Sequence, residues 1–225
     1  MKALRFALIA LLLVAGSASA HPITSFQRNG AQAKQPRIVE DHIPYGPQRK
    51  RQMGAYSKRH YGTRTWHLTR RKVIVLHFTA GPSYESARNH FASNSPNRGE
   101  LPGVCAHYIV DKDGTIYETV QPGVRCRHAI GLNHRSVGIE MVQEAGKSSH
   151  WADRQILERR PQIGAALKLV SYLRARFGIR MGDVIGHAMA NNSSYFRDLQ
   201  GWRNDHTDWL WRDVKVFRRR LKRMS

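Results

Sequence analysis

The sequence has 225 residues and a formal net charge of +21, from 37 Lys and Arg against 16 Asp and Glu. This length allows one domain with a proper hydrophobic core. The positive charge favours an anionic partner, but no recognisable nucleic-acid motif accompanies it. After residue 20, no apolar run approaches the ~20 residues that span a bilayer.

The first twenty residues have the pattern of a secretory signal peptide. Lys2 and Arg5 precede an apolar run over 6–15, and small residues follow up to Ala20, where an A-x-A cleavage site ends. We expect cleavage before His21 and export to the periplasm or the extracellular space, with a retained, weakly hydrophobic anchor as the alternative. Removal of the signal leaves 35 Lys and Arg against 16 Asp and Glu, a net charge of +19.

Residues 21–70 are polar and basic, contain three prolines after position 30 and show no sustained hydrophobic periodicity. Such composition predicts a loosely ordered leader. This leader either wraps the domain that follows or is disordered. We place the domain itself at 71–225.

From residue 73 onward, short apolar runs alternate with amphipathic segments. Strands are predicted at 73–76, 104–110, 115–120, 136–142 and 183–187, and Asp113-Gly114 is a hairpin signal between the second and third. Helices are predicted at 83–92, at 151–177 with a break at Pro161, and at 210–221. This order indicates a single α/β domain with a mixed central β-sheet flanked by helices.

The two cysteines, Cys105 and Cys126, lack the spacing of a zinc finger. An even number of cysteines in an oxidising compartment favours a disulfide over two free thiols. A bond closing a loop of this length stabilises a fold by ~3 kcal/mol. We therefore assign the pair a structural role.

Two histidines lie at the ends of predicted strands. His77 ends the first strand, His187 follows Gly186 at the end of the last, and His206 and Asp208 come 19 and 21 residues later. A catalytic zinc takes imidazole and carboxylate ligands and keeps one position open for water. A single histidine among twelve is usually a packed or surface residue, so the combination, rather than any one of them, points to a metal site.

Five short motifs accompany these residues. They are HFTAG at 77–81, AHYIVDKDG at 106–114, HA at 128–129, SVGIE at 136–140 and GH at 186–187. In order and spacing they resemble the zinc-dependent N-acetylmuramoyl-L-alanine amidases, which share their fold with peptidoglycan recognition proteins and phage lysozyme-type amidases. The resemblance covers about residues 73–220. It implies a zinc hydrolase that cuts the amide bond between N-acetylmuramic acid and the L-alanine of peptidoglycan.

The resemblance also implies a set of zinc ligands. His77 and His187 match the first two, and Asp208 is the best match for the third, with Asp198 as a competing candidate nearer to His187 in sequence. The chain departs from its relatives just after the third ligand. They usually continue with Pro-Gly, whereas this chain continues with Trp209-Leu210.

Two further residues match catalytic positions of the family. Glu140 corresponds to the catalytic acid, which would take a proton from water and pass it to the leaving amine. His206 stands where relatives often carry a Lys, and an imidazolium there could donate to the developing oxyanion. His107 and His128 match cleft or packing positions rather than metal ligands.

A second function stays open at this point, because the same fold also hosts proteins that bind peptidoglycan without cleaving it. The presence of all the metal candidates together with Glu140 favours the enzyme. We expect peptidoglycan or muropeptides as substrate, and anionic cell-envelope polymers as partners of the +19 surface. We expect no nucleic acid, no stable membrane span and a monomer.

Overall fold

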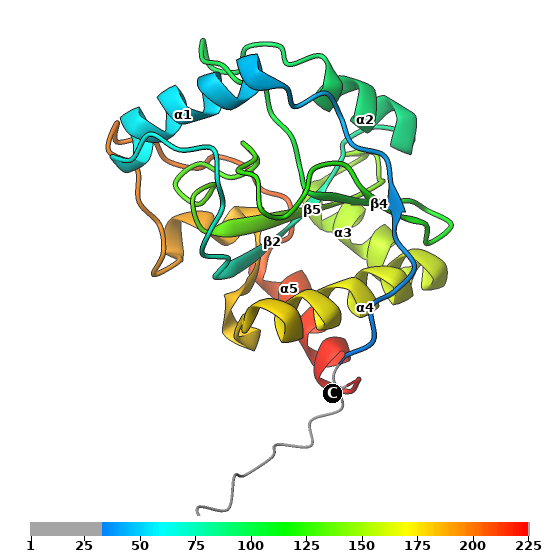
Figure 1. The fold of residues 1–225 in the computed structure, drawn as a ribbon. Coiled ribbons are helices and arrows are strands. Elements are labelled where there is room, and N and C mark those ends of the chain that lie inside the picture. Colours follow the sequence, from blue (N-terminus) through cyan, green and yellow to red (C-terminus); the bar gives the residue numbers. More distant parts are fainter. Residues whose placement is uncertain (1–32, 225) are drawn as a thin grey trace, which may run out of the picture. The chain divides into compact units, whose positions relative to one another are not determined.

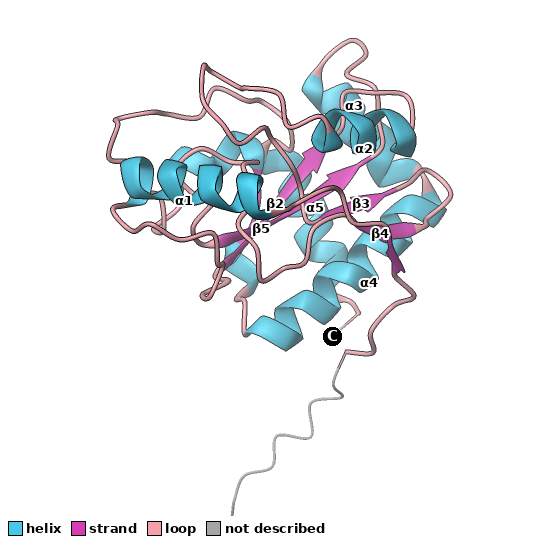
Figure 2. Ribbon diagram, turned by 45° about the horizontal axis from the view of Figure 1, so that its top comes forward, coloured by secondary structure: helices cyan, strands magenta, loops and turns pink. Residues whose placement is uncertain are grey.

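The structure is a computed structural model that describes residues 33–224, so the predicted signal peptide lies outside the described residues. Its six-stranded sheet has the order β1-β4-β3-β5-β2-β6. Figure 2 shows strands of this sheet running between the helices. Only β3 and β4 pair antiparallel, through the predicted hairpin, and the other neighbours are parallel. The predicted α/β class with a mixed sheet is confirmed. The strands are β1 (Val39–Glu40), β2 (Val73–Phe78), β3 (Tyr108–Val110), β4 (Ile116–Glu118), β5 (Ser136–Met141) and β6 (Val184–Gly186).

Helices cover both faces of this sheet (Figure 1). They are α1 (Pro47–Tyr61), α2 (Tyr84–Ala92), α3 (Ser149–Glu158), α4 (Arg160–Phe177) and α5 (Trp211–Lys222). The largest apolar cluster joins one face of the sheet to α3, α4 and α5. A smaller cluster joins the other face to α2, and another is formed by side chains of α1 itself. The predicted break near Pro161 is the boundary between α3 and α4, because proline is tolerated in the first turn of a helix. No helix within 33–224 is long and apolar enough to cross a membrane.

Side chains alternate between the two faces along β2. Ile74 and Leu76 pack into the cluster with α3 to α5, whereas Val73 and Val75 lie in a cluster on the opposite face. His77 follows the alternation of Val73 and Val75. It therefore projects from the face that α1 and α2 cover.

Residues 47–61 form the helix α1, so the prediction of a loosely ordered segment is wrong there. The buried side of α1 carries Met53 and Tyr56 but also the polar Arg49 and His60. A hydrophobic pattern search misses such a helix, because it registers only apolar residues. These buried polar side chains are hydrogen-bonded to residues that lie far away in the sequence. The Arg49 guanidinium, for example, donates to the carbonyl of Phe91 at 2.8 Å.

The two cysteines form the expected disulfide. Cys105 and Cys126 are joined, with their Cα atoms 5.3 Å apart, and both are buried. The bond connects the segment before β3 to the segment that leads into His128. Both segments lie on the side of the sheet to which His77 points.

Candidate active site

Three neighbouring parallel strands end at one edge of the sheet. Leu76 of β2 pairs in register with Gly186 of β6, which brings the next residues, His77 and His187, to the same level. On the other side of β2, His77 pairs in register with Glu140 of β5. Carboxyl ends of parallel strands are where open α/β sheets place their ligands. Strand register thus brings together residues that lie far apart in the sequence.

Asp208 completes a compact group with the two histidines. His77 Nδ1 lies 3.0 Å from His187 Nδ1 and 3.3 Å from Asp208 Oδ2, and His187 Nδ1 lies 3.1 Å from Asp208 Oδ1. All three side chains are buried. Donor atoms around a tetrahedral ion with bonds of about 2.0–2.1 Å lie roughly 3.3 Å apart. The donor types and their spacing therefore fit a zinc ion.

The electrostatics of the group favour the protonation states that bind metals. Burial, and then the neighbouring His187, lower the pKa of His77 to about 4, so its imidazole is neutral. Burial alone would raise the pKa of Asp208. Hydrogen bonds and charge from His187 and His77 outweigh that effect and hold its pKa well below the ordinary value. A neutral imidazole and an ionised carboxylate are the forms that act as ligands.

The second nitrogen of His77 has a partner of its own. His77 Nε2 lies 3.1 Å from His128 Nδ1. With a metal on Nδ1, Nε2 would carry the ring proton and donate it to His128. His128 Nε2 in turn lies 3.1 Å from Ser136 Oγ. The His128 ring packs directly over Gly138, where a Cβ atom would lie 2.7 Å from the ring.

This chain of contacts orients the ring of His77, as outer hydrogen bonds commonly do for metal-binding histidines. In the sequence, His128 matched only a cleft or packing position, and Ser136 was named only as the first residue of the SVGIE motif. The HA motif at 128–129 was the available signal. The other histidine assigned to packing, His107, is buried and hydrogen-bonds the carbonyl of Val124 through Nε2.

Glu140 lies in the same cavity as the three candidate ligands. Its Oε2 atom is buried and has no hydrogen-bond partner among the described residues. Burial, together with the nearby Asp208 carboxylate, raises the pKa of Glu140 to about 8. A carboxyl group with an uncommitted oxygen and a pKa near neutrality is suited to accept and return a proton.

His206 lies beside the group rather than in it. Its ring stacks on that of His187, with centroids 4.2 Å apart, and its Nδ1 is 3.9 Å from Asp208 Oδ1. Burial, and then His187, lower the pKa of His206, which favours the neutral ring over the imidazolium considered above. A neutral imidazole still carries one N–H donor.

A cavity of about 890 Å³ contains these residues and extends well beyond them. Its walls come from α2, from the loop that carries Asn97 and Arg98, and from Arg127. The volume exceeds what a single amide group needs. It falls in the range of sites that take a sizeable ligand.

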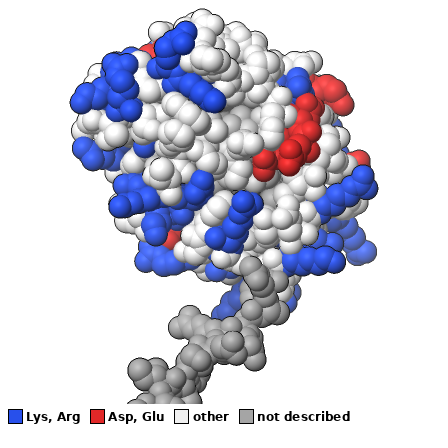
Figure 3. Space-filling view, in the orientation of Figure 1, with Lys and Arg blue, Asp and Glu red and all other residues white. Residues whose placement is uncertain are grey.

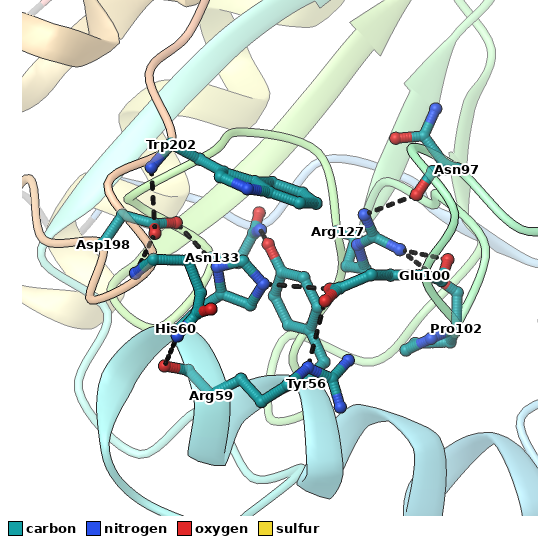
Figure 4. Close-up of polar contacts among 11 residues, drawn as sticks. Tyr56, Arg59, His60, Asn97, Glu100, Pro102, Arg127, Asn133, Asp198 and Trp202 are labelled. Atoms are coloured by element: carbon teal, nitrogen blue, oxygen red, sulfur yellow. Dashed lines mark hydrogen bonds and ion pairs between the residues drawn. The ribbon is translucent and has the colours of Figure 1, made fainter.

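Asp198, the competing third ligand, lies in a different cluster (Figure 4). Its Oδ2 atom is 2.8 Å from His60 Nδ1, and His60 Nε2 is 2.9 Å from Glu100 Oε2. These contacts join α1 to two loops that lie far away in the sequence. No local pattern in the sequence indicates them, and they leave Asp208 as the acid beside His77 and His187.

One family model and several solved structures match the chain. Residues 68–208 match the Amidase_2 family, described as N-acetylmuramoyl-L-alanine amidase. No curated protein sequence matches the chain. Among solved structures, the Staphylococcus aureus hydrolase AmiA in complex with its ligand is 16% identical, with a TM-score of 0.53 and 84% of each chain covered. At that identity the similarity is one of fold.

Two further structures are similar at lower scores. The N-acetylmuramoyl-L-alanine amidase LysC from Clostridium intestinale URNW is 18% identical, with a TM-score of 0.48, and the match covers 81% of this chain and 97% of LysC. The Ph2119 endolysin from a Thermus scotoductus bacteriophage is 22% identical, with a TM-score of 0.46, and the match covers 70% of this chain and 90% of the endolysin.

Proposed function

The chain belongs to the N-acetylmuramoyl-L-alanine amidase family, as its motifs predicted, and from this premise we propose that it hydrolyses the amide between N-acetylmuramic acid and L-alanine in peptidoglycan. The observation that carries the proposal is the meeting of His77, His187 and Asp208 beside Glu140 in one cavity. The alternative of a peptidoglycan-binding protein without activity would leave this arrangement without a use.

In the proposed reaction His77, His187 and Asp208 hold a zinc ion. When bound, the ion polarises the amide carbonyl, lowers the pKa of water and favours the ionised form of Glu140. Glu140 accepts the proton of the attacking water and passes it to the leaving alanine nitrogen, acting first as general base and then as general acid. His206 donates a hydrogen bond to the oxygen on which negative charge develops.

A digest of purified cell-wall sacculi tests this function. We expect free stem peptides that begin with L-alanine, together with glycan strands whose lactyl groups are unsubstituted, both identified by mass. A chelator should abolish their release and added zinc should restore it, because the reaction depends on the bound ion. Binding to sacculi without release of stem peptides would favour the non-catalytic alternative, and peptides still linked to muramic acid would show that another bond is cut.

We infer that the protein acts in the periplasm or outside the cell, as a monomer retained at anionic polymers. The cations on the solvent-exposed face of α5 support this retention. Val214, Phe217 and Leu221 of this helix are buried in the core, so its solvent face is left to cations and the half-exposed Trp211. Figure 3, drawn in the orientation of Figure 1, shows Lys and Arg spread widely over the face of the molecule that it presents. The exposed cations of α5 and its C-terminal cap are Arg212, Lys215, Arg219, Lys222 and Arg223.

Reversing two of these charges, with Lys215→Glu and Arg219→Glu, is expected to weaken binding to isolated cell walls by more than about tenfold at low salt, since a cation near an anionic surface contributes ~1 kcal/mol. Added salt should weaken binding of the unaltered protein steeply. The matched control reverses Arg160 and Lys168, two exposed cations of α4, and changes the net charge equally. Equal weakening in both variants would show that α5 is not the retaining face.

A further inference from the structure

The loop after Asp208 takes a path that a Pro-Gly sequence could not follow. Trp209 has a φ of 55°, in the left-handed region. Proline is confined to a φ of about −65°, so it cannot adopt this conformation. An L-residue other than glycine is strained there, and such conformations persist only where surrounding contacts hold them. The contacts of Trp209 must therefore hold it in this conformation, and they show which parts of the molecule it connects.

The side chain of Trp209 connects the third candidate ligand to the first. The indole is fully buried, and its Nε1–H donates to the carbonyl of His77 at 3.2 Å. The ring packs edge to face against Phe217 of α5, with centroids 5.6 Å apart. The residue next to Asp208 thus binds the backbone of His77 itself.

The backbone of the same loop is held by a buried acid on α3. Asp153, which is 0% exposed, accepts the N–H of Trp209 at 3.1 Å and the N–H of Leu210 at 3.2 Å, one with each carboxylate oxygen. These are the two amides that directly follow Asp208. Two acceptor oxygens of one side chain on consecutive amides restrain both the position and the direction of the loop.

The loop also contacts the segment that carries the second candidate ligand. The carbonyl of Asp208 accepts the N–H of Ala188 at 2.9 Å. On the other side of His187, a Cβ atom at Gly186 would lie 1.7 Å from the carbonyl oxygen of Trp209. Only glycine allows this approach. The loop at 208–210 is therefore in contact with the backbone on both sides of His187 and with that of His77.

We propose that Trp209 and Asp153 are positioning residues of the metal site, which hold the Asp208 carboxylate at its distance from His77 and His187. This inference rests on the proposed function, since it takes that group as the zinc site. His77 and His187 lie 110 residues apart, and Asp208 lies in a loop that pairs with no strand within residues 33–224. Without other restraints, ordering that carboxylate would cost conformational entropy each time the ion binds.

Two conservative substitutions separate positioning from mere packing. Trp209→Phe keeps an aromatic ring in the core but removes the N–H donor to His77. Asp153→Asn keeps the shape of the side chain but presents an NH₂ group to one of the two amides. We expect each to weaken zinc binding by about 10–100-fold, the usual effect of lost outer hydrogen bonds. The zinc dissociation constant of the full chain is measured by competition with a chromogenic chelator, alongside thermal unfolding of the zinc-free protein.

Asp213→Asn serves as the matched control. Asp213 is also a buried acid between α3 and α5, and it binds His150 Nδ1 at 2.8 Å, but its side chain has no hydrogen bond to the loop at 208–210. This variant should unfold at a lower temperature and bind zinc as tightly as the unaltered protein.

Different results would overturn the positioning role and the proposed function. Zinc affinity that is unchanged in Trp209→Phe and Asp153→Asn, whatever their unfolding temperatures, would overturn the positioning role. Should the Asp153 variant fail to fold, the Trp209 variant decides alone. If the unaltered protein itself bound no zinc, the proposed function would fail instead.

Discussion

Glu140→Gln is expected to lower the rate of muropeptide cleavage by about 10²–10⁴-fold, the range that general acid–base catalysis contributes. The amide of Gln has nearly the size of the carboxylate but cannot accept a proton. Glu140 Oε2 has no hydrogen-bond partner among the described residues, so the substitution breaks no such bond there. Its effect should therefore fall on proton transfer rather than on folding.

The measurement pairs turnover with zinc content. Because Glu140 is not one of the three candidate ligands, the variant should bind zinc in the same stoichiometry as the unaltered protein. Glu144→Gln is the matched control, since Glu144 lies four residues further on and is exposed. A Glu140→Gln protein that cleaved muropeptides at the native rate would contradict the assigned role.

Asp208→Asn is expected to abolish activity by a different route, through loss of the ion. The neutral amide is a weaker ligand than a carboxylate, and it removes the negative charge that His77 and His187 face at 3.3 and 3.1 Å. Zinc affinity should fall by more than about 100-fold, beyond the effect of outer hydrogen bonds.

Asp198→Asn provides the control for this experiment, because it was the rival ligand on sequence grounds. Its carboxylate contacts His60, so the variant should lose some stability and keep its zinc. Zinc content is measured on purified protein after dialysis. Loss of zinc from the Asp198 variant, with retention in the Asp208 variant, would reverse the ligand assignment.

The strands and the helices after residue 73 followed from patterns within single segments. The β-branched run of β2, the Asp-Gly hairpin and the cap at Ser83 are all signals that nearby residues create. His77 at the end of a buried strand was recognisable for the same reason. The helix α1 was not, because polar residues such as Arg49 and His60 make up much of its buried side, and their partners lie elsewhere in the chain.

The choice between Asp198 and Asp208 shows most directly what the sequence cannot predict about the site. Both acids follow His187 at distances that a loop can span, and the match to the family ranks Asp208 first without placing either acid in space. The structure brings Asp208 to the two histidines through the contacts of Trp209, and it pairs Asp198 with His60. Distance along the chain within a long loop carries no information about position in space.

The sequence by itself determined the family, the α/β class and the strand ends that carry His77 and His187. Only the tertiary structure decided which acid joins them, which hydrogen bonds orient them and how α1 packs. The physical reason is that hydrophobic periodicity and turn signals act within one element. Strand register, hydrogen bonds between buried polar groups and the path of the loop at 208–210 depend on segments that meet only when the chain folds.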